Sequence, residues 1–171
     1  MAKKRYFGEQ GDIAVRVDGK LFIHRCAYLV IQDGKLLLSY AENDENPHYF
    51  IPGGKVKCGM DTQTSVIREV LEETSIDVPA DNVSMAVHSE RFFKHKQTGM
   101  KGHEVCTMFR VKLPKGSCVP KRERDGGKFL FCWIPLEDLA TLNFRESYVF
   151  QQVKDISQGI HHVVHREVTD Q

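Results

Sequence analysis

The N-terminal part of the chain consists of apolar-rich runs separated by short polar breaks. Three such runs lie at residues 13–17, 21–31 and 35–40, and the pairs Asp18-Gly19 and Asp33-Gly34 separate them. An Asp-Gly pair between apolar runs favours a tight hairpin turn, because both residues tolerate a positive φ angle. The pattern therefore predicts a β-meander that begins with hairpins.

Further apolar runs predict strands at residues 49–51, 83–93, 105–113 and 129–134. Residues 41–48 are polar and contain a proline, so we expect a loop there. Asn143 with Glu146 three residues later predicts a helix N-cap with a capping box, and this helix would run to about Ile156. Mixed strands with two main helices predict an α/β sandwich.

The segment that follows Met60 has the period of an amphipathic helix. At about 100° per residue, one side of this helix carries Ile67, Val70 and Leu71. Asp61 or Thr62 is suited to cap its start, because either side chain can accept a hydrogen bond from the first turn. Pro79 prevents its continuation, because proline lacks an N–H group and restricts the residue before it.

The opposite side of the predicted helix carries three carboxylates, Glu69, Glu72 and Glu73, at positions i, i+3 and i+4. Like charges at this spacing repel one another, so the arrangement costs stability unless a cation lies between them. Hard cations such as Mg2+ prefer oxygen ligands and are commonly bound together with phosphates. The spacing indicates metal-assisted phosphate chemistry, and a solvated acidic face without a ligand is the alternative.

A glycine pair precedes this helix in the segment Phe50-Ile51-Pro52-Gly53-Gly54-Lys55-Val56. Together the two segments resemble the signature of the Nudix hydrolase family (MutT-like). The positions that match its spacing are Gly54, Arg68, Glu69, Val70, Glu72, Glu73 and Ile76. Met60 stands where the family has its first Glu, and Ser75 stands where it has a glycine with left-handed backbone.

The resemblance implies what these residues would do. Glu69, Glu72 and Glu73 would bind Mg2+ or Mn2+, with the Gly53 carbonyl as a further ligand, and Gly53, Gly54 and Lys55 would form the binding loop. Arg68 would brace that loop, and with Met60 in place of Glu its partner would be lost unless Asp61 replaced it. Glu104, in the pair His103-Glu104, resembles a fourth carboxylate beside the metal site, as ligand or base. Either Glu69 or Glu104 would take the proton of the attacking water.

The resemblance also implies a fold and an activity. The fold would be an α/β/α sandwich with a mixed β-sheet and N-terminal β-hairpins. A single domain would span residues 1–171, with a core at about 21–156 and an N-terminal extension at 1–20. The reaction would be hydrolysis of a phosphoric anhydride in a nucleoside diphosphate linked to another moiety or in a nucleoside triphosphate. The alternative is a catalytically weakened domain that binds a nucleotide as sensor or regulator.

Composition narrows the classes of partner. The 171 residues include 24 basic and 23 acidic ones, for a formal net charge of +1, so no strong attraction to nucleic acid or to an anionic membrane is expected. No apolar run approaches the length of a membrane span or follows the basic N-terminus as in a signal peptide. Five cysteines without close pairing favour the reducing cytoplasm. We expect a small nucleotide as partner, and a homodimer stays an open option.

Two further segments carry chemistry-bearing side chains without a clear pattern. His161 and His165 would form an i, i+4 pair in a helix, but no acidic or cysteine partner has suitable spacing for zinc, so we expect a solvated tail. Residues 121–125 mix both charge signs before the glycines at 126 and 127 and predict a surface loop.

Overall fold

The computed structural model describes residues 11–42, 46–95, 98–124, 128–149, 153 and 159–167. Its larger sheet has the strand order β1-β2-β6-β5-β8, in which β2 pairs with β6, and β5 with β8, in parallel. These strands are β1 (Ala14–Val17), β2 (Lys20–Leu29), β5 (Val83–Lys94), β6 (Lys101–Val111) and β8 (His161–Arg166). The smaller sheet, in the order β3-β4-β7, contains β3 (Ile31–Gln32), β4 (Lys35–Ala41) and β7 (Phe129–Pro135).

Both predicted Asp-Gly turns are confirmed. Asp18, Gly19, Asp33 and Gly34 all have positive φ angles, and each pair joins two antiparallel strands. The continuous meander is wrong, because β2 pairs with β6 while β4 pairs with β7, which places the two hairpins in different sheets. The strand predicted at residues 49–51 is also wrong, because Tyr49 and Phe50 form only isolated bridges.

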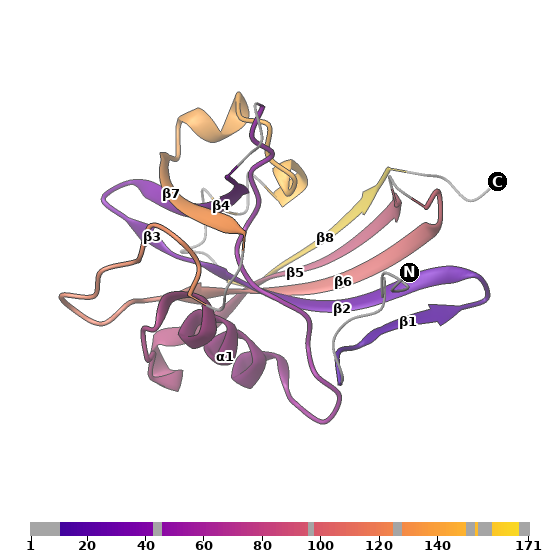
Figure 1. Ribbon diagram of the computed structural model, residues 1–171, viewed down its shortest axis with the longest axis horizontal. Helices are drawn as coiled ribbons and strands as arrows, with labels where there is room; N and C mark the ends of the chain where they lie inside the picture. Colours follow the sequence, from indigo (N-terminus) through magenta and orange to yellow (C-terminus); the bar gives the residue numbers. More distant parts are fainter. Residues whose placement is uncertain are drawn as a thin grey trace.

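The mixed sheet lies between two layers, as expected for an α/β sandwich (Figure 1). On one side of it lies α1 (Thr62–Thr74), and on the other lie β4, β7 and the short 3-10 helices Asp138–Ala140 and Ser147–Val149. Val66 and Val70 of α1 are completely buried against Tyr28 of β2 and Phe109 of β6. The far end of the larger sheet extends beyond α1 (Figure 1). No helix in the described ranges is long and apolar enough to span a membrane.

The C-terminal part corrects two expectations. His161 and His165 lie on the strand β8 rather than in a solvated tail or a helix, because this segment pairs in parallel with β5. Glu146 does not form a capping box: its carboxylate accepts the N–H of Ile51, while the Asn143 side chain contacts His48. The rest of the predicted helix, at residues 150–152 and 154–156, lies outside the described residues.

Candidate active site

The glycine loop runs along β2 beyond the residues that pair with β1. The N–H groups of Tyr28 and Cys26 donate to the carbonyls of Pro52 and Gly54, at 3.0 and 2.9 Å. Gly53, between them, has a φ of 137°, and a Cβ on it would lie 2.4 Å from the Cys26 carbonyl oxygen. Only glycine fits here, because a side chain would be strained by the backbone angle and would also collide with β2.

The second glycine makes room for a carboxylate. A Cβ on Gly54 would lie 2.2 to 2.6 Å from three carboxyl-group atoms of Glu69. The absence of a side chain at Gly54 is therefore what lets Glu69, 8% exposed, pack directly against the loop. The glycine pair and the helix thus form one structural unit, as their spacing in the sequence predicted.

Both ends of α1 form as expected. Asp61 is the N-cap, and its carboxylate accepts the N–H of Thr64 at 2.8 Å. Ser75 ends the helix in left-handed geometry with φ 61° and ψ 21°, and its N–H donates to the Leu71 carbonyl. The predicted apolar side is only partly correct, because Leu71 is 46% exposed whereas Glu69 and Glu73 are buried. The helix is rotated so that part of its acidic face points inward.

Arg68 connects the helix to the loop. It donates to Glu72 at 2.7 Å and to the Lys55 carbonyl at 3.3 Å, and it contacts the Glu69 carboxylate. Asp61 does not replace the missing glutamate at position 60, because its side chain is used to cap Thr64. The Arg68 Nε is buried and has no hydrogen-bond partner among the described residues. Arg68 therefore contacts the loop through the Lys55 carbonyl, while Glu69 and Glu72 pair with its charge.

Glu73 is the most strongly perturbed carboxyl group of the helix. Burial raises its pKa to about 8, opposed by a hydrogen bond from the Tyr28 hydroxyl and reinforced by the charges of Glu123 and Glu69. Burial likewise raises the pKa of Glu69, although Arg68 opposes that shift. Burial, together with the repulsion between neighbouring carboxylates, thus disfavours the charged forms of these two groups.

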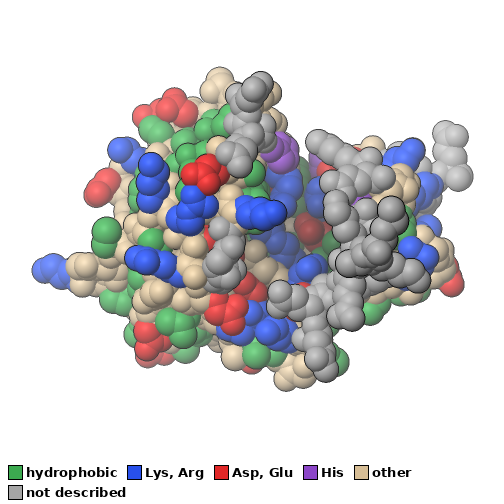
Figure 2. All heavy atoms as spheres, viewed as in Figure 1, with side chains coloured by type: hydrophobic (Ala, Val, Ile, Leu, Met, Phe, Trp, Pro, Cys, Tyr) green, Lys and Arg blue, Asp and Glu red, His purple; other side chains and the backbone are tan. Residues whose placement is uncertain are grey.

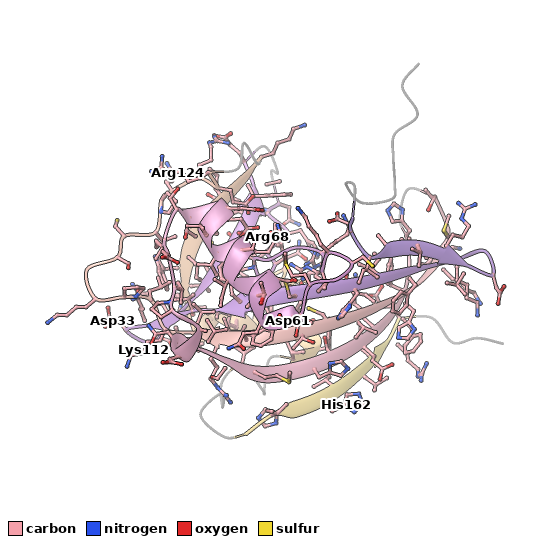
Figure 3. All side chains as sticks on the ribbon, turned by 90° about the horizontal axis from the view of Figure 1, so that it is seen from below. Asp33, Asp61, Arg68, Lys112, Arg124 and His162 are labelled. Atoms are coloured by element: carbon pink, nitrogen blue, oxygen red, sulfur yellow. The ribbon has the colours of Figure 1, made fainter. Side chains whose placement is uncertain are left out.

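Glu123 is a buried carboxylate that the sequence analysis missed. It accepts a hydrogen bond from Ser39 at 3.3 Å, and its backbone N–H donates to the Phe129 carbonyl. The next N–H, that of Arg124, donates to the Glu73 carbonyl at the end of α1, where Figure 3 labels Arg124. The segment that contains Glu123 was predicted to be a surface loop, and nothing in its mixed-charge sequence marks Glu123 as buried.

These groups share one cavity of about 510 Å³. Its lining combines the carboxylates of Glu69, Glu72, Glu73, Glu123 and Asp12 with Gly53, Gly54, Lys55, Lys57, Arg68, Phe50 and Phe129. The Lys55 ammonium lies 3.5 Å from the Asp12 carboxylate. Three glutamates predicted as metal ligands are therefore brought to one wall, together with both glycines and Lys55.

Glu104 lines a neighbouring cavity of about 500 Å³, which shares Gly53, Gly54 and Lys55 with the first. It is buried and lies 3.4 Å from the Nε of Arg91. The molecular face shown in Figure 2 is hollowed near its centre, where blue and red side chains meet. Glu104 is therefore adjacent to the carboxylate cluster but is not a member of it.

A buried ion-pair network holds the start of the glycine loop. Arg25 donates to the Ile51 carbonyl at 2.7 Å, and Glu146 accepts the Ile51 N–H at 3.1 Å. Arg25 and Glu146 also pair with each other at 3.2 Å, and Arg145 donates to Glu146 at 2.7 Å. Burial alone would raise the pKa of Glu146, but Arg145 and Arg25 hold it below its ordinary value. Arg25 and Glu146, which lie outside the family signature, thus bind the carbonyl and the N–H group of Ile51.

The donor set fits a hard divalent cation in its chemistry. It consists of carboxylate groups, two of them buried with raised pKa values, beside the loop that carries the Gly53 carbonyl. Across the described ranges, however, no three His, Cys, Asp or Glu side chains already form a closed ligand group. Glu72 and Glu69 are held by Arg68, so a cation would have to displace part of that contact.

Comparison with known proteins defines the class. The sequence model of the NUDIX domain matches residues 22–153, and the chain belongs to this family. No curated protein sequence matches it.

Solved structures share the fold at low sequence identity. The MutT protein of Bacillus halodurans is 18% identical, with a TM-score of 0.64 over 84% of this chain and 89% of that one. The MutT NUDIX hydrolase of Burkholderia pseudomallei is 22% identical, with a TM-score of 0.57 over 77% and 98%. An Ap4A hydrolase of C. elegans is 17% identical, with a TM-score of 0.54 over 81% and 99%.

Proposed function

We propose that this protein is a divalent-metal-dependent hydrolase that cleaves a phosphoric anhydride bond in a nucleoside triphosphate or in a nucleoside diphosphate linked to another moiety. The observation that carries the proposal is the pair of buried carboxylates, Glu69 and Glu73, with raised pKa values beside the glycine loop. Membership of the Nudix family supports it. So does the structural similarity to MutT proteins and an Ap4A hydrolase, within the limits of a shared fold.

In this proposal Glu69, Glu72, Glu73 and the Gly53 carbonyl hold Mg2+ or Mn2+. The cation would neutralise phosphate charge and lower the pKa of a bound water. Arg68 positions Glu69 and Glu72 and fixes the loop through the Lys55 carbonyl. Lys55 and Lys57 line the same cavity and supply positive charge for phosphate oxygens.

A base must take the proton from the attacking water. Between the two predicted candidates we favour Glu69, because it lines the cavity of the carboxylate cluster, whereas Glu104 lines the neighbouring cavity. Glu123 is a third candidate, since it lines the carboxylate cavity itself. Separate Glu69→Gln, Glu104→Gln and Glu123→Gln variants would tell them apart, because loss of the base removes one limb of the pH–rate profile.

The test is product release from nucleoside triphosphates, dinucleoside polyphosphates and nucleotide sugars, with Mg2+, with Mn2+ and with a chelator. Turnover should require the metal, should fall in Glu73→Gln, and should persist in Glu137→Gln, which changes an exposed glutamate away from the cavity. Equal turnover in both variants would reject the site.

The second candidate function, nucleotide binding without turnover, is favoured by one observation. Arg68 is held by Glu69 and Glu72 in the absence of the family's glutamate at position 60. Metal-dependent nucleotide binding without product release across the panel would establish that function.

We also propose one domain over residues 1–171. The five cysteines are free, in keeping with a reducing compartment such as the cytoplasm.

A further inference from the structure

Tyr28 is a tyrosine on β2 that contacts both halves of the candidate site. Its side chain is completely buried in the core cluster that also contains Val66 and Val70 of α1. Its N–H donates to the Pro52 carbonyl at 3.0 Å, and its hydroxyl donates to the Glu73 carboxylate. One residue therefore connects the glycine loop, through its backbone, with the last turn of α1, through its side chain.

The three glutamates of α1 are held in different ways. Arg68 pairs with both Glu69 and Glu72. Glu73 has no such cation: within the part of the chain that the structure describes, its carboxylate forms one hydrogen bond, which the Tyr28 hydroxyl donates to Oε2. The orientation of the Glu73 carboxylate, which lines the cavity of the carboxylate cluster, therefore depends on Tyr28.

A buried carboxylate is a costly acceptor for a tyrosine that only fills the core. A buried tyrosine hydroxyl needs a hydrogen-bond partner, and a neutral carbonyl would supply one without burying a charge. Here the partner is Glu73, whose charged form is already disfavoured by burial and by the neighbouring charge of Glu123. An apolar residue at position 73 would pack on Tyr28 without that cost, so the pair indicates a function of the carboxylate rather than stability alone.

We propose that Tyr28 is a positioning residue of the metal site, whose hydroxyl holds Glu73 through Oε2 and so directs this carboxylate into the cavity that Glu69 and Glu72 also line. The inference rests on the proposed function, in which Glu73 is a ligand of Mg2+ or Mn2+. Tyr28 acts through Glu73 and is not itself a ligand. Hydrogen bonds to a ligating side chain fix its orientation, and their loss typically weakens metal binding by about 10- to 100-fold.

Calorimetric titration of the metal-free protein with Mn2+ tests the inference without turnover. Tyr28→Phe removes the hydroxyl and retains the ring that packs against α1, and it should raise the dissociation constant for Mn2+ by about tenfold. The matched control Tyr40→Phe removes a hydroxyl from β4 that does not line the carboxylate cavity, and it should leave the constant unchanged. A change below about twofold in Tyr28→Phe, or an equal change in both variants, would overturn the proposed role.

A double-mutant cycle shows whether Tyr28 acts through Glu73. In Glu73→Gln the hydroxyl has no carboxylate ligand to hold, so the additional change Tyr28→Phe should weaken Mn2+ binding no further. Additive losses would overturn the inference, because they would place the effect of Tyr28 elsewhere. Thermal unfolding of the same variants provides the structural readout: a tyrosine that only fills the core would lower stability without this coupling in metal affinity.

Steady-state kinetics links the role of Tyr28 to turnover. At limiting Mn2+, Tyr28→Phe should lower kcat while KM for the nucleotide changes little, and saturating Mn2+ should restore most of the rate. A loss that saturating Mn2+ does not reduce would overturn a role in holding the metal. If the protein binds Mn2+ but hydrolyses nothing, the proposed function fails, whereas the calorimetry still decides the role of Tyr28. Absence of Mn2+ binding would overturn both.

Discussion

Buried charges are neutralised to different degrees in two regions beside the glycine loop, the carboxylate cluster at α1 and the Arg25–Glu146 pair. At the α1 end, Glu69, Glu73 and Glu123 are buried together, and burial raises the pKa of the first two. At the other end, Arg25 and Glu146 are equally buried, but each has a partner of opposite charge, and the pKa of Glu146 is lowered. The Arg25–Glu146 pair is balanced within the protein, whereas we propose that a cation completes the carboxylate cluster.

We interpret this difference as one between residues that hold the structure and residues that would bind a ligand. A buried ion pair with its hydrogen bonds satisfied is costly to break but needs nothing from outside. Buried carboxylates that repel one another destabilise the folded protein, and they persist where a function requires them. Mutations of the Arg25–Glu146 pair should therefore mainly lower stability, whereas mutations of the carboxylate cluster should mainly lower activity.

The largest expected effect is on stability, at the buried Arg25–Glu146 pair. Glu146→Gln leaves Arg25 buried without its carboxylate and should lower the free energy of unfolding by about 3 to 5 kcal/mol. Urea denaturation followed by circular dichroism measures this change. The double variant Arg25→Met/Glu146→Gln should recover part of the loss, because it removes the unpaired charge as well. A loss below about 1 kcal/mol in the single variant, the scale of a surface pair, would show that the pair is not structural.

The second effect is on activity, at the carboxylate end. Glu72→Gln should lower kcat/KM by at least about 100-fold, because it removes a charged ligand from the proposed cation. Its stability should hardly change, since Glu72 is exposed. Metal-dependent product release and urea denaturation are measured on the same preparation, with Glu137→Gln as the control. A loss in activity below about threefold, far smaller than the loss expected for a metal ligand, would contradict the assignment of Glu72.

The third effect is stabilisation by metal, and it should depend on pH. Burial raises the pKa of Glu73 from 4.5 to about 8, so within this window the folded metal-free protein holds a proton that the unfolded chain has released. Its stability should therefore fall as the pH rises from 4.5 to 8.

Mg2+ at concentrations well above its dissociation constant should restore roughly 1 to 3 kcal/mol of that stability. The gain should be larger at the upper end of the pH window, where the cation no longer competes with a proton. Thermal unfolding with Mg2+ and with a chelator measures it. The same gain in Glu73→Gln would show that the cation binds elsewhere.

Local sequence was sufficient for the helix and the turns but not for how they are buried. The caps at Asp61 and Ser75 and both Asp-Gly hairpins depend on neighbouring residues, and the sequence predicted them. The rotation of α1 is set by a distant contact, because the Glu69 carboxylate occupies the space left open at Gly54. Leu71 is therefore exposed, although the helical period placed it on the apolar side.

The residues that sequence could not identify are those that depend on long-range pairing. The strand β8 has the sequence His-His-Val-Val-His-Arg, without a strand-like alternation, and it forms because β5 offers a parallel edge. Glu123 becomes buried through contacts with Ser39 and Phe129, neither of which its own segment indicates. The same holds for the contacts of Glu146 with Ile51 and Arg25.

A fourth, smaller effect concerns the missing glutamate of the signature. Met60→Glu should raise turnover severalfold, on the order of 1 kcal/mol in the barrier, because a new acceptor for Arg68 would release Glu72 toward the cation. Met60→Gln is the matched control, since it is of similar size but lacks the charge. An unchanged or lower rate in Met60→Glu would show that the chain already braces the loop without this glutamate, through contacts such as that of Arg68 with the Lys55 carbonyl.

The smallest expected effect separates the fold of α1 from its chemistry. Ser75 has a left-handed backbone that disfavours a side chain, so Ser75→Gly should raise the free energy of unfolding by about 0.5 to 1 kcal/mol. The kinetic constants should stay the same, because Ser75 caps the helix through the Leu71 carbonyl and does not line the carboxylate cavity. Asp61→Ala provides the comparison at the other end and should lower stability by about 1 kcal/mol. If Ser75→Gly instead changed kcat without changing stability, the end of α1 would control the position of Glu73 directly, and the glycine of the family signature would have a role in catalysis rather than in helix termination.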